Sequence, residues 1–333
     1  MSALYHKDDA VAIHLGDCRD ILPTLEPGSA QTCVTSPPYF GLRDYGHESQ
    51  IGLERTPDEY VAALVAAFRD VRRVLADDGT LWLNLGDSYA NDGKWGGHSS
   101  GKHACGGLEH QPIGRNKRYT GLKPKDLVGI PWRVAFALQA DGWWLRSDII
   151  WHKPNPMPES VTDRPTKAHE YLFLLTKAER YYYDAKAIAE PATFPDGPNA
   201  PDKIKPPYGQ GYTRRSGNTK RKMGDERGRP GSHLGGSIPW EGATRNKRSV
   251  WTVSTRPYKG AHFATFPPDL IRPCILAGAP VGGVVLDPFG GSGTTGMVAK
   301  EHGRRAVLIE AKPDYCALSR DRCGTTPQRT DGP

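Results

Sequence analysis

The sequence predicts an α/β domain built on a mostly parallel sheet, and three observations support this prediction. Short apolar runs typical of buried strands alternate with helical periodicity toward both ends of the chain. A glycine-rich turn at residues 290–293 joins one such run to the helix expected after it. This alternation stops near residue 185, where a stretch rich in Pro, Gly, Arg and Lys begins. We therefore expect one sheet domain that carries an irregular insertion.

The N-terminal part of the chain predicts strands and helices in turn. Residues 10–17 and 31–36 are short apolar runs that end in turn residues, as buried strands do. Residues 56–76 place apolar side chains at helical spacing, with an early proline, acids near the start and arginines near the end, which predicts an amphipathic helix. Further elements are expected as a helix at 130–142 and strands at 79–87, 144–151 and 169–177.

Two polar regions interrupt this pattern. Residues 88–125 contain many glycines and little periodicity, which predicts a long loop. Within the expected insertion, residues 201–250 contain 12 Lys and Arg against 4 Asp and Glu, which leaves 32 against 33 in the rest of the chain. Because the formal charge of +7 is concentrated there, we expect this segment to contact a polyanion. Composition alone would favour a solvated linker.

The C-terminal part of the chain returns to alternating elements. A helix is expected at 267–278, then a strand ending at Asp287, the glycine-rich turn, a second helix, and a strand ending at Glu310. Backbone can approach a ligand closely at such a turn, and a carboxylate at the end of the next strand can accept both ribose hydroxyls of a nucleoside. Since Asp287 beside the turn would repel a phosphate, S-adenosylmethionine fits better than a dinucleotide. A turn selected only for tight packing is the alternative.

A rigid corner, Ser-Pro-Pro-Tyr at residues 36–39, follows the second expected strand. Pro37 and Pro38 fix the backbone and remove two N–H donors. The amine of cytosine or adenine is a poor nucleophile because its lone pair is delocalised, so acceptors around it, such as the Ser36 hydroxyl and the Pro37 carbonyl, would favour methyl transfer. The Tyr39 ring offers a face for a base rotated out of the duplex. Taken alone, the corner could simply end a strand.

Together these motifs resemble the amino-group DNA methyltransferases, which modify cytosine N4 or adenine N6. The order, with VTSPPYFGLRD near the N-terminus and LDPFGGSGTTG near the C-terminus, is similar to the permuted β group of that family. The resemblance extends to IIWHKPNPMP and covers most of the chain outside 88–125 and 185–255. It implies an S-adenosylmethionine-dependent methyltransferase fold, Rossmann-like, with a seven-stranded, mostly parallel sheet. The one reversed strand is expected at 169–177, with a partner running up to Asp184.

The resemblance also implies the site residues and the division of the chain. Residues 1–184 would form the catalytic half, 185–255 the target-recognition insertion and 256–333 the cofactor-binding half. The catalytic corner would comprise Ser36, Pro37, Pro38 and Tyr39. S-Adenosylmethionine would be bound by Asp17, Thr265, Phe266, Asp287, Pro288, Phe289, Gly290, Gly291, Ser292, Gly293, Thr294 and Glu310. DNA would be contacted by Arg214, Arg215, Lys220, Arg221, Lys222, Arg227, Arg229, Arg245, Lys247 and Arg248.

The implied activity is methyl transfer from S-adenosylmethionine to the N4 amine of cytosine in duplex DNA, by base flipping and direct in-line transfer. Ser before the two prolines is more often associated with cytosine in this family, and adenine N6 is the alternative. An RNA or protein-amide methyltransferase and an inactive DNA-recognition subunit are further alternatives. The partners implied are double-stranded DNA and a restriction endonuclease of the same system, with the protein itself a monomer or a homodimer.

Two expectations concern what the chain lacks. The N-terminus has no apolar leader and no run reaches the roughly 18 apolar residues that span a bilayer, so we expect a cytoplasmic protein, bacterial or phage-encoded, without membrane contact. His98, His103, Cys105 and His110 lie in the long loop without the spacing of zinc ligands, so no metal is expected.

Overall fold

The computed structural model describes residues 3–42, 50–90, 120–192, 244–255 and 266–324. The chain divides into two compact units. One comprises Met1–Ile188 together with Arg248–Pro333, and the other is Ala189–Lys247. The described ends of the second unit form two short antiparallel strands, β7 (Glu190–Pro191) and β8 (Thr244–Arg245).

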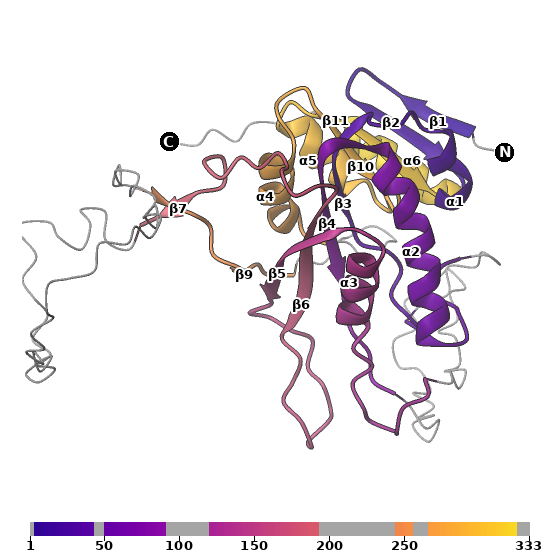
Figure 1. Ribbon diagram of the computed structural model, residues 1–333, viewed down its shortest axis with the longest axis vertical. Helices are drawn as coiled ribbons and strands as arrows, with labels where there is room; N and C mark the ends of the chain where they lie inside the picture. Colours follow the sequence, from indigo (N-terminus) through magenta and orange to yellow (C-terminus); the bar gives the residue numbers. More distant parts are fainter. Residues whose placement is uncertain (1–2, 43–49, 91–119, 193–243, 256–265, 325–333) are drawn as a thin grey trace, which may run out of the picture. The chain divides into compact units, whose positions relative to one another are not determined.

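The larger unit contains a nine-stranded sheet in the order β1-β2-β11-β10-β3-β4-β6-β5-β9 (Figure 1). Its strands are β1 (Ala3–Lys7), β2 (Val11–Leu15), β3 (Ala30–Thr35), β4 (Leu75–Leu85), β5 (Trp144–His152), β6 (His169–Thr176), β9 (Val250–Thr252), β10 (Val284–Asp287) and β11 (Arg305–Glu310). The neighbouring strands β2, β11, β10, β3 and β4 run parallel. β6 runs antiparallel to both β4 and β5, and β1 runs antiparallel to β2.

Helices cover both faces of this sheet, and alternate residues of the strands serve the two faces. The helices are α1 (Cys18–Ile21), the 3-10 helix η1 (Leu22–Thr24), α2 (Pro57–Val74), α3 (Ile130–Ala140), α4 (Pro268–Gly278), α5 (Thr294–Glu301) and α6 (Pro313–Gly324). Leu81 and Leu83 of β4 belong to a buried cluster with α1, α2 and α3, whereas Trp82 belongs to a cluster with α4, α5 and α6. This period of two is that of a strand buried on both faces.

Local signals explain why α2 forms where it does. The Thr56 hydroxyl caps the helix by accepting from the Glu59 N–H, and Pro57 occupies the first turn, where its missing N–H costs nothing. Leu64, Phe68 and Val71 recur at helical spacing and are fully buried against the sheet. The helix therefore ends close to the residues that sequence periodicity predicted.

The sheet confirms the mostly parallel fold and the reversed strand expected at residues 169–177, which is β6. Two edge strands, β1 and β9, extend the expected seven to nine. The partner proposed for β6 was wrong, because β6 pairs with β4 and β5. Residues 181–184 lie outside the strands, and the N–H groups of Tyr182 and Asp184 donate to the backbone carbonyls of Asp78 and Ala277.

The boundary of the insertion also differs from the expected one. Residues 185–255 were expected to form it, yet Val250–Thr252 is strand β9, parallel to β5 in the main sheet. The reason is apolar burial: Trp251 is 6% exposed, lies 6.4 Å from Trp82 between ring centroids, and donates from Nε1 to the Arg248 carbonyl at 2.6 Å. A short apolar run inside a basic stretch thus belongs to the larger unit.

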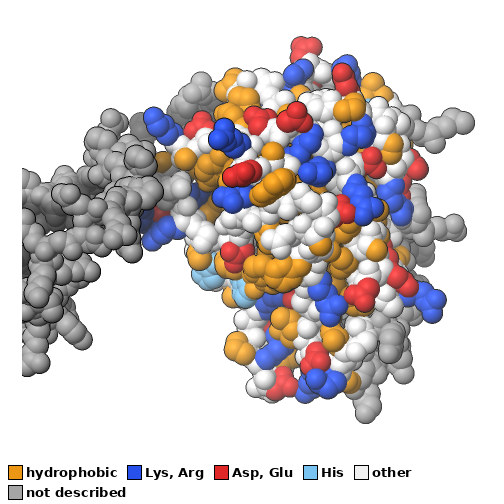
Figure 2. Space-filling view, in the orientation of Figure 1, with side chains coloured by type: hydrophobic (Ala, Val, Ile, Leu, Met, Phe, Trp, Pro, Cys, Tyr) orange, Lys and Arg blue, Asp and Glu red, His pale blue; other side chains and the backbone are white. Residues whose placement is uncertain are grey.

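The surface of the described residues adds two observations. Acidic and basic side chains are interspersed over the face seen in Figure 2. Among the helices that the structure describes, none has both the length and the apolar character required to cross a membrane.

Candidate active site

The expected site residues meet at one edge of the sheet because the strands that precede them are parallel neighbours. β3 leads into the Ser-Pro-Pro-Tyr corner, β10 ends at Asp287 and β11 ends at Glu310. β10 pairs with β3 on one side and with β11 on the other, so the corner and the glycine-rich turn start from adjacent strand ends. Ligands of open α/β sheets bind at this edge. Two motifs about 250 positions apart in sequence therefore share one location.

Asp287 joins the corner to the glycine-rich turn. One carboxylate oxygen accepts from the Thr35 hydroxyl at 2.6 Å and from the Phe289 N–H at 3.0 Å, and the other accepts from the Thr295 hydroxyl at 2.6 Å. The side chain is 1% exposed, and this burial raises the pKa of Asp287 to about 6, against the lowering effect of its three donors. Both oxygens expected to face the cofactor are thus engaged by protein groups.

Glu310 presents a carboxylate at the next strand end. Its two oxygens accept from the N–H groups of Gly291 and Lys312, each at 2.9 Å. Burial raises the pKa of Glu310 to about 7, although these backbone bonds act to lower it. Each oxygen of a carboxylate can accept a second hydrogen bond, so the pair can also receive two ribose hydroxyls. This donor set fits the nucleoside end of S-adenosylmethionine.

The glycine-rich turn is partly a packing device. A Cβ on Gly290 would lie 3.1 Å from the Leu308 Cβ, and one on Gly293, whose φ is 76°, would lie 2.7 Å from the Ser319 hydroxyl. The packing alternative therefore accounts for these two glycines. Gly291 also has a positive φ, 50°, and is half-exposed together with Phe289, whereas Pro288, Gly290, Ser292, Gly293 and Thr294 are buried. Direct contact from the turn is thus restricted to Phe289, Gly291 and backbone groups.

Arg322 of α6 is a contributor that sequence reasoning missed. Its guanidinium donates to the hydroxyls of Ser292 at 2.6 Å and Thr294 at 3.0 Å. These bonds direct both expected site side chains toward α6 and fix the start of α5. Arginines at the end of a C-terminal helix are usually solvated, so the sequence carries no signal for this contact.

The remaining cofactor candidates lie at the same edge or outside the described residues. Asp17 caps α1, and its carboxylate accepts from the Arg19 N–H and guanidinium. The adjacent Gly16 N–H donates to the Glu310 carbonyl at 2.9 Å, which brings Asp17 next to Glu310. Phe266 precedes α4 and packs half-buried against the cluster of α4, α5 and α6. Thr265 lies outside the described residues.

The corner is fixed by bonds to both its backbone and its side chains. The Tyr60 hydroxyl donates to the Pro38 carbonyl at 2.9 Å, and the Leu42 N–H donates to the Tyr39 carbonyl. Ser36, Pro38 and Tyr39 are half-buried, while Pro37 is buried. The Pro38 carbonyl is thus occupied, which leaves the Ser36 hydroxyl and the Pro37 carbonyl as the acceptors to consider at this corner.

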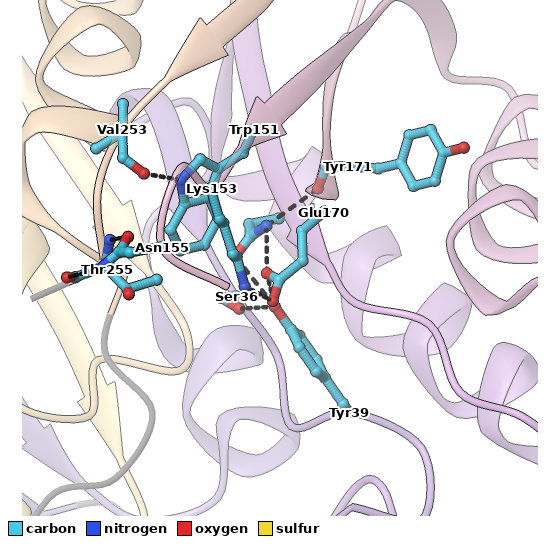
Figure 3. A network of polar contacts seen from close by, with 10 residues as sticks. Ser36, Tyr39, Trp151, Lys153, Asn155, Glu170, Tyr171, Val253 and Thr255 are labelled. Atoms are coloured by element: carbon cyan, nitrogen blue, oxygen red, sulfur yellow. Dashed lines mark hydrogen bonds and ion pairs between the residues drawn. The ribbon is translucent and has the colours of Figure 1, made fainter. Parts of the chain in front are cut away.

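The Tyr39 hydroxyl lies in a polar network that the sequence did not predict (Figure 3). It approaches the Glu170 carboxylate at 2.8 Å and the Asn84 side-chain oxygen at 3.1 Å. Lys153 forms an ion pair with Glu170 and lies over the Trp151 ring, 4.3 Å from its centroid. Burial beside Glu170 raises the pKa of Tyr39 well above its usual value, so the phenol is neutral.

Most of the DNA-contact candidates are not among the described residues, so their expected role stays a prediction. The exceptions are Arg245, Lys247 and Arg248, and Arg245 donates to Glu190 at 3.1 Å. Those outside the described ranges are Arg214, Arg215, Lys220, Arg221, Lys222, Arg227 and Arg229, and so are His98, His103, Cys105 and His110. In the described part of the chain, no three His, Cys, Asp or Glu side chains are grouped as metal ligands.

The sequence of this chain is similar to those of known enzymes. Residues 30–321 match the DNA methylase family of N6 and N4 methyltransferases. The chain is 47% identical over 307 residues to Type II methyltransferase M.XycI of Xanthomonas campestris pv. cyanopsidis, covering 92% of this chain and 85% of that protein. It is 45% identical over 310 residues to M.SmaI of Serratia marcescens, covering 93% and 89%.

Solved structures share the fold. The PvuII DNA methyltransferase, cytosine-N4-specific, aligns with a TM-score of 0.61 at 18% identity, covering 98% of this chain and 92% of that one. A DNA modification methylase of Thermus thermophilus, solved with S-adenosyl-L-methionine, aligns with a TM-score of 0.55 at 22% identity, covering 94% and 92%. Since the family match spans most of the chain and the relatives match over nearly their whole length, this protein belongs to the DNA methylase family and is a DNA methyltransferase of the N4/N6 type, related to Type II modification enzymes.

Proposed function

We propose that this methyltransferase modifies the exocyclic N4 amine of cytosine in duplex DNA. The observation that carries the proposal is the hydrogen bond from Thr35 to Asp287, which holds the Ser-Pro-Pro-Tyr corner beside the glycine-rich turn. A base at the corner and a methyl donor at the turn would then lie at adjacent strand ends. In-line transfer between two held reactants needs this proximity.

The chain supplies the groups that prepare the target amine. The Ser36 hydroxyl and the Pro37 carbonyl would accept its N–H protons, which favours a pyramidal nitrogen whose lone pair points away from the ring. The Tyr39 ring would stack on the base after it has left the duplex. Transfer to an amine needs no covalent intermediate with the protein, so the buried cysteines have no part in it.

S-Adenosylmethionine is the cofactor that the site fits. When bound, it supplies a methyl group on a positively charged sulfur. Glu310 would hold the ribose, Asp17 the adenine end, and Phe289 and Gly291 the half-exposed surface of the turn. Phe266, with its neighbour Thr265, would contribute at the methionine end. Asp287, Ser292 and Thr294 would act by fixing the turn, since their polar atoms bond to protein groups.

The choice of cytosine over adenine rests on Ser36 and on one structural neighbour. A serine hydroxyl is a neutral acceptor, and the neighbour with a TM-score of 0.61 is cytosine-N4-specific. Adenine N6 is the second candidate, because the matching family comprises both activities. The basic residues between 201 and 250 would supply phosphate contacts, with one or two arginines available for guanine edges.

The named relatives with the highest identity are Type II methyltransferases of bacteria, which gives the proposal a setting. We infer a bacterial or phage-encoded enzyme that meets its DNA in the cytoplasm, as a monomer or homodimer. A restriction endonuclease of the same system would be its partner in function. Plasmid recovered from cells that express the protein should resist such a nuclease.

The test is incubation of the protein with unmethylated plasmid DNA and methyl-labelled S-adenosylmethionine, followed by digestion to nucleosides and chromatography. We expect label in 4-methylcytosine. Label in 6-methyladenine would establish the second candidate, and label in neither would contradict both. Pro37→Ala is the matched control, expected to lose transfer while it retains cofactor binding.

A further inference from the structure

A chain of hydrogen bonds leads from Glu170 to the expected acceptor Ser36. Glu170 lies at the start of β6, and its Oε2 is 2.8 Å from the Tyr39 hydroxyl oxygen. That oxygen is in turn 3.5 Å from the Ser36 hydroxyl, at the long limit of a hydrogen bond. Figure 3 shows the three groups facing one another between the corner and β6. Such contacts are commonly long before substrate binds.

The direction of each proton in this chain is fixed by what surrounds Tyr39. Asn84 donates from its amide nitrogen to the Tyr171 carbonyl at 3.0 Å, so its oxygen is the atom that faces Tyr39, at 3.1 Å. Glu170, as a carboxylate paired with Lys153, can only accept. Because both of these neighbours are acceptors, the single hydroxyl proton of Tyr39 must point toward them. The Tyr39 oxygen can then only accept on its remaining side, where Ser36 lies.

Glu170 is held in place as a charged group. Lys153 pairs with its other oxygen, and the side chains of both residues are only 17% exposed. Lys153 also lies over the Trp151 ring, which is anchored by a bond from Nε1 to the Val253 carbonyl at 2.8 Å. An ammonium that contacts an aromatic face and a carboxylate is strongly localised. The acceptor at the end of the chain is therefore permanent.

We propose that Glu170 is a positioning residue that acts through Tyr39 to make the Ser36 hydroxyl a hydrogen-bond acceptor toward the target base. A serine hydroxyl can otherwise donate or accept. With its proton directed to Tyr39, Ser36 presents lone pairs, which suit an amine N–H and repel a carbonyl oxygen. The site thereby selects bases with an exocyclic amine, such as cytosine, over bases with a carbonyl at that position, such as uracil. This rests on the proposed methylation of an exocyclic amine.

A double-mutant cycle tests the chain. Glu170→Gln and Tyr39→Phe each remove a link while they keep the shape of the side chain. Turnover is measured on unmethylated plasmid DNA with labelled S-adenosylmethionine. We expect each single variant to lose about 10- to 100-fold in kcat, with the KM for S-adenosylmethionine unchanged. The double variant should lose no more than the less active single variant, because the links act in series.

Losses that multiply in the double variant, or an unchanged kcat in Glu170→Gln, would overturn the proposal. Thermal unfolding of all variants separates this from instability caused by leaving Lys153 unpaired. Glu170→Gln combined with Lys153→Met removes both charges and should restore stability without restoring kcat. Glu301→Gln, at the exposed end of α5, is the matched control and should behave as the unsubstituted protein.

Base selection gives a second readout, which a purely structural role of Glu170 would not move. Once sequencing of methylated plasmid has located the target, two duplexes are compared that carry cytosine or uracil at that position. The affinity ratio of the two is measured for the unsubstituted protein and for Glu170→Gln. We expect the substitution to narrow the ratio about 10-fold, since the cost of opening each duplex cancels. An identical ratio in both proteins would contradict the selection role.

Failure of the proposed function is distinguishable from failure of this inference. If nucleoside analysis yields 6-methyladenine, the cytosine assignment fails, and the cycle is still measured on that product with hypoxanthine as the carbonyl analogue. If the product is 4-methylcytosine and the cycle is multiplicative, the proposed function stands and the hydrogen-bond chain is rejected.

Discussion

At the scale of single residues, the space around Tyr39 is set by a residue that carries no side chain. Gly86 follows β4, and a Cβ built on it would lie 2.4 Å from Tyr39 Cε2 and 2.8 Å from Cδ2. These are ring atoms with no flexible end that could move aside. A glycine here thus allows the ring to reach Glu170, and its requirement is steric.

Gly86→Ala should therefore displace the Tyr39 ring and reduce kcat by at least about 10-fold, with smaller effects on cofactor affinity. Steady-state methylation of plasmid DNA measures the loss, and titration calorimetry measures the affinity. Gly324→Ala is the control, because nothing lies within 4 Å of a Cβ at that position. If the two variants have equal kcat, the ring position is not set by this contact.

Glu310 predicts a pH-dependent stability. Burial raises its pKa from the ordinary 4.5 to about 7 in the folded chain, so the folded state binds the proton more tightly than the unfolded chain does. This contribution is fully present below about pH 4.5 and is lost as the pH rises through about 7. In urea unfolding without cofactor, Glu310→Gln should remove a fall of about 1–3 kcal/mol across this window. Parallel curves for the two proteins would show that no such shift exists.

At the scale of elements, Asp287 connects three neighbours: β3 through Thr35, the turn through Phe289 and α5 through Thr295. The three bonds converge on a side chain that is almost inaccessible to water. A buried donor that loses its acceptor pays its full desolvation cost. The alignment of the corner with the turn therefore depends on this one carboxylate.

Asp287→Asn should lower the free energy of unfolding by about 1–3 kcal/mol and also reduce kcat, because an amide cannot accept at both ends. Thr295→Val removes one donor and should cost less. Denaturant unfolding and turnover measure the two effects. Retained stability with full activity in Asp287→Asn would show that the elements are aligned by packing alone.

How far the elements could be predicted depended on whether their signals were local. α2 was predicted from its cap, its proline and its apolar spacing, all of which lie within the helix. β1 and β9 were missed, because Ala3–Lys7 has mixed polarity and Val250–Thr252 is too short to show a period. The glycine-rich turn and Glu310 were predicted because the motif implies a strand on each side.

The parts of the site that could not be predicted depend on contacts between distant segments. Glu170 was placed in a strand, but nothing in the sequence pairs it with Tyr39, 131 positions away. That contact follows from β6 lying beside β4, an order that local pattern does not fix. The same holds for Arg322 and Asp287, whose partners lie on other elements.

At the scale of the whole molecule, the basic excess should govern DNA binding. The segment 201–250 contains 12 of the 44 Lys and Arg of the chain, and it separates the two halves of the sheet in sequence. Phosphate contacts release counterions, so the logarithm of the binding constant falls with the logarithm of salt concentration. The slope reports the number of such contacts.

Replacing Lys220, Arg221 and Lys222 by Gln should reduce the magnitude of that slope by about 2.7 on duplex DNA if all three contact phosphates. Fluorescence anisotropy with a labelled duplex measures it between roughly 50 and 200 mM salt, the range over which such affinities change steeply. Replacing Lys300, which pairs with Asp8 in the larger unit, should leave the slope unchanged. An unaltered slope in the triple variant would exclude these residues from DNA contact.

The position of β10 between β3 and β11 has a consequence for how the chain is made. β3 leaves the ribosome early, yet one of its two sheet partners ends only at residue 287. During synthesis, that side of β3 has unpaired backbone groups, and pairing over so long a separation is slow. A nascent chain of this protein therefore exposes an adhesive strand edge for most of its translation, which makes it a natural client for chaperones that bind at the tunnel exit.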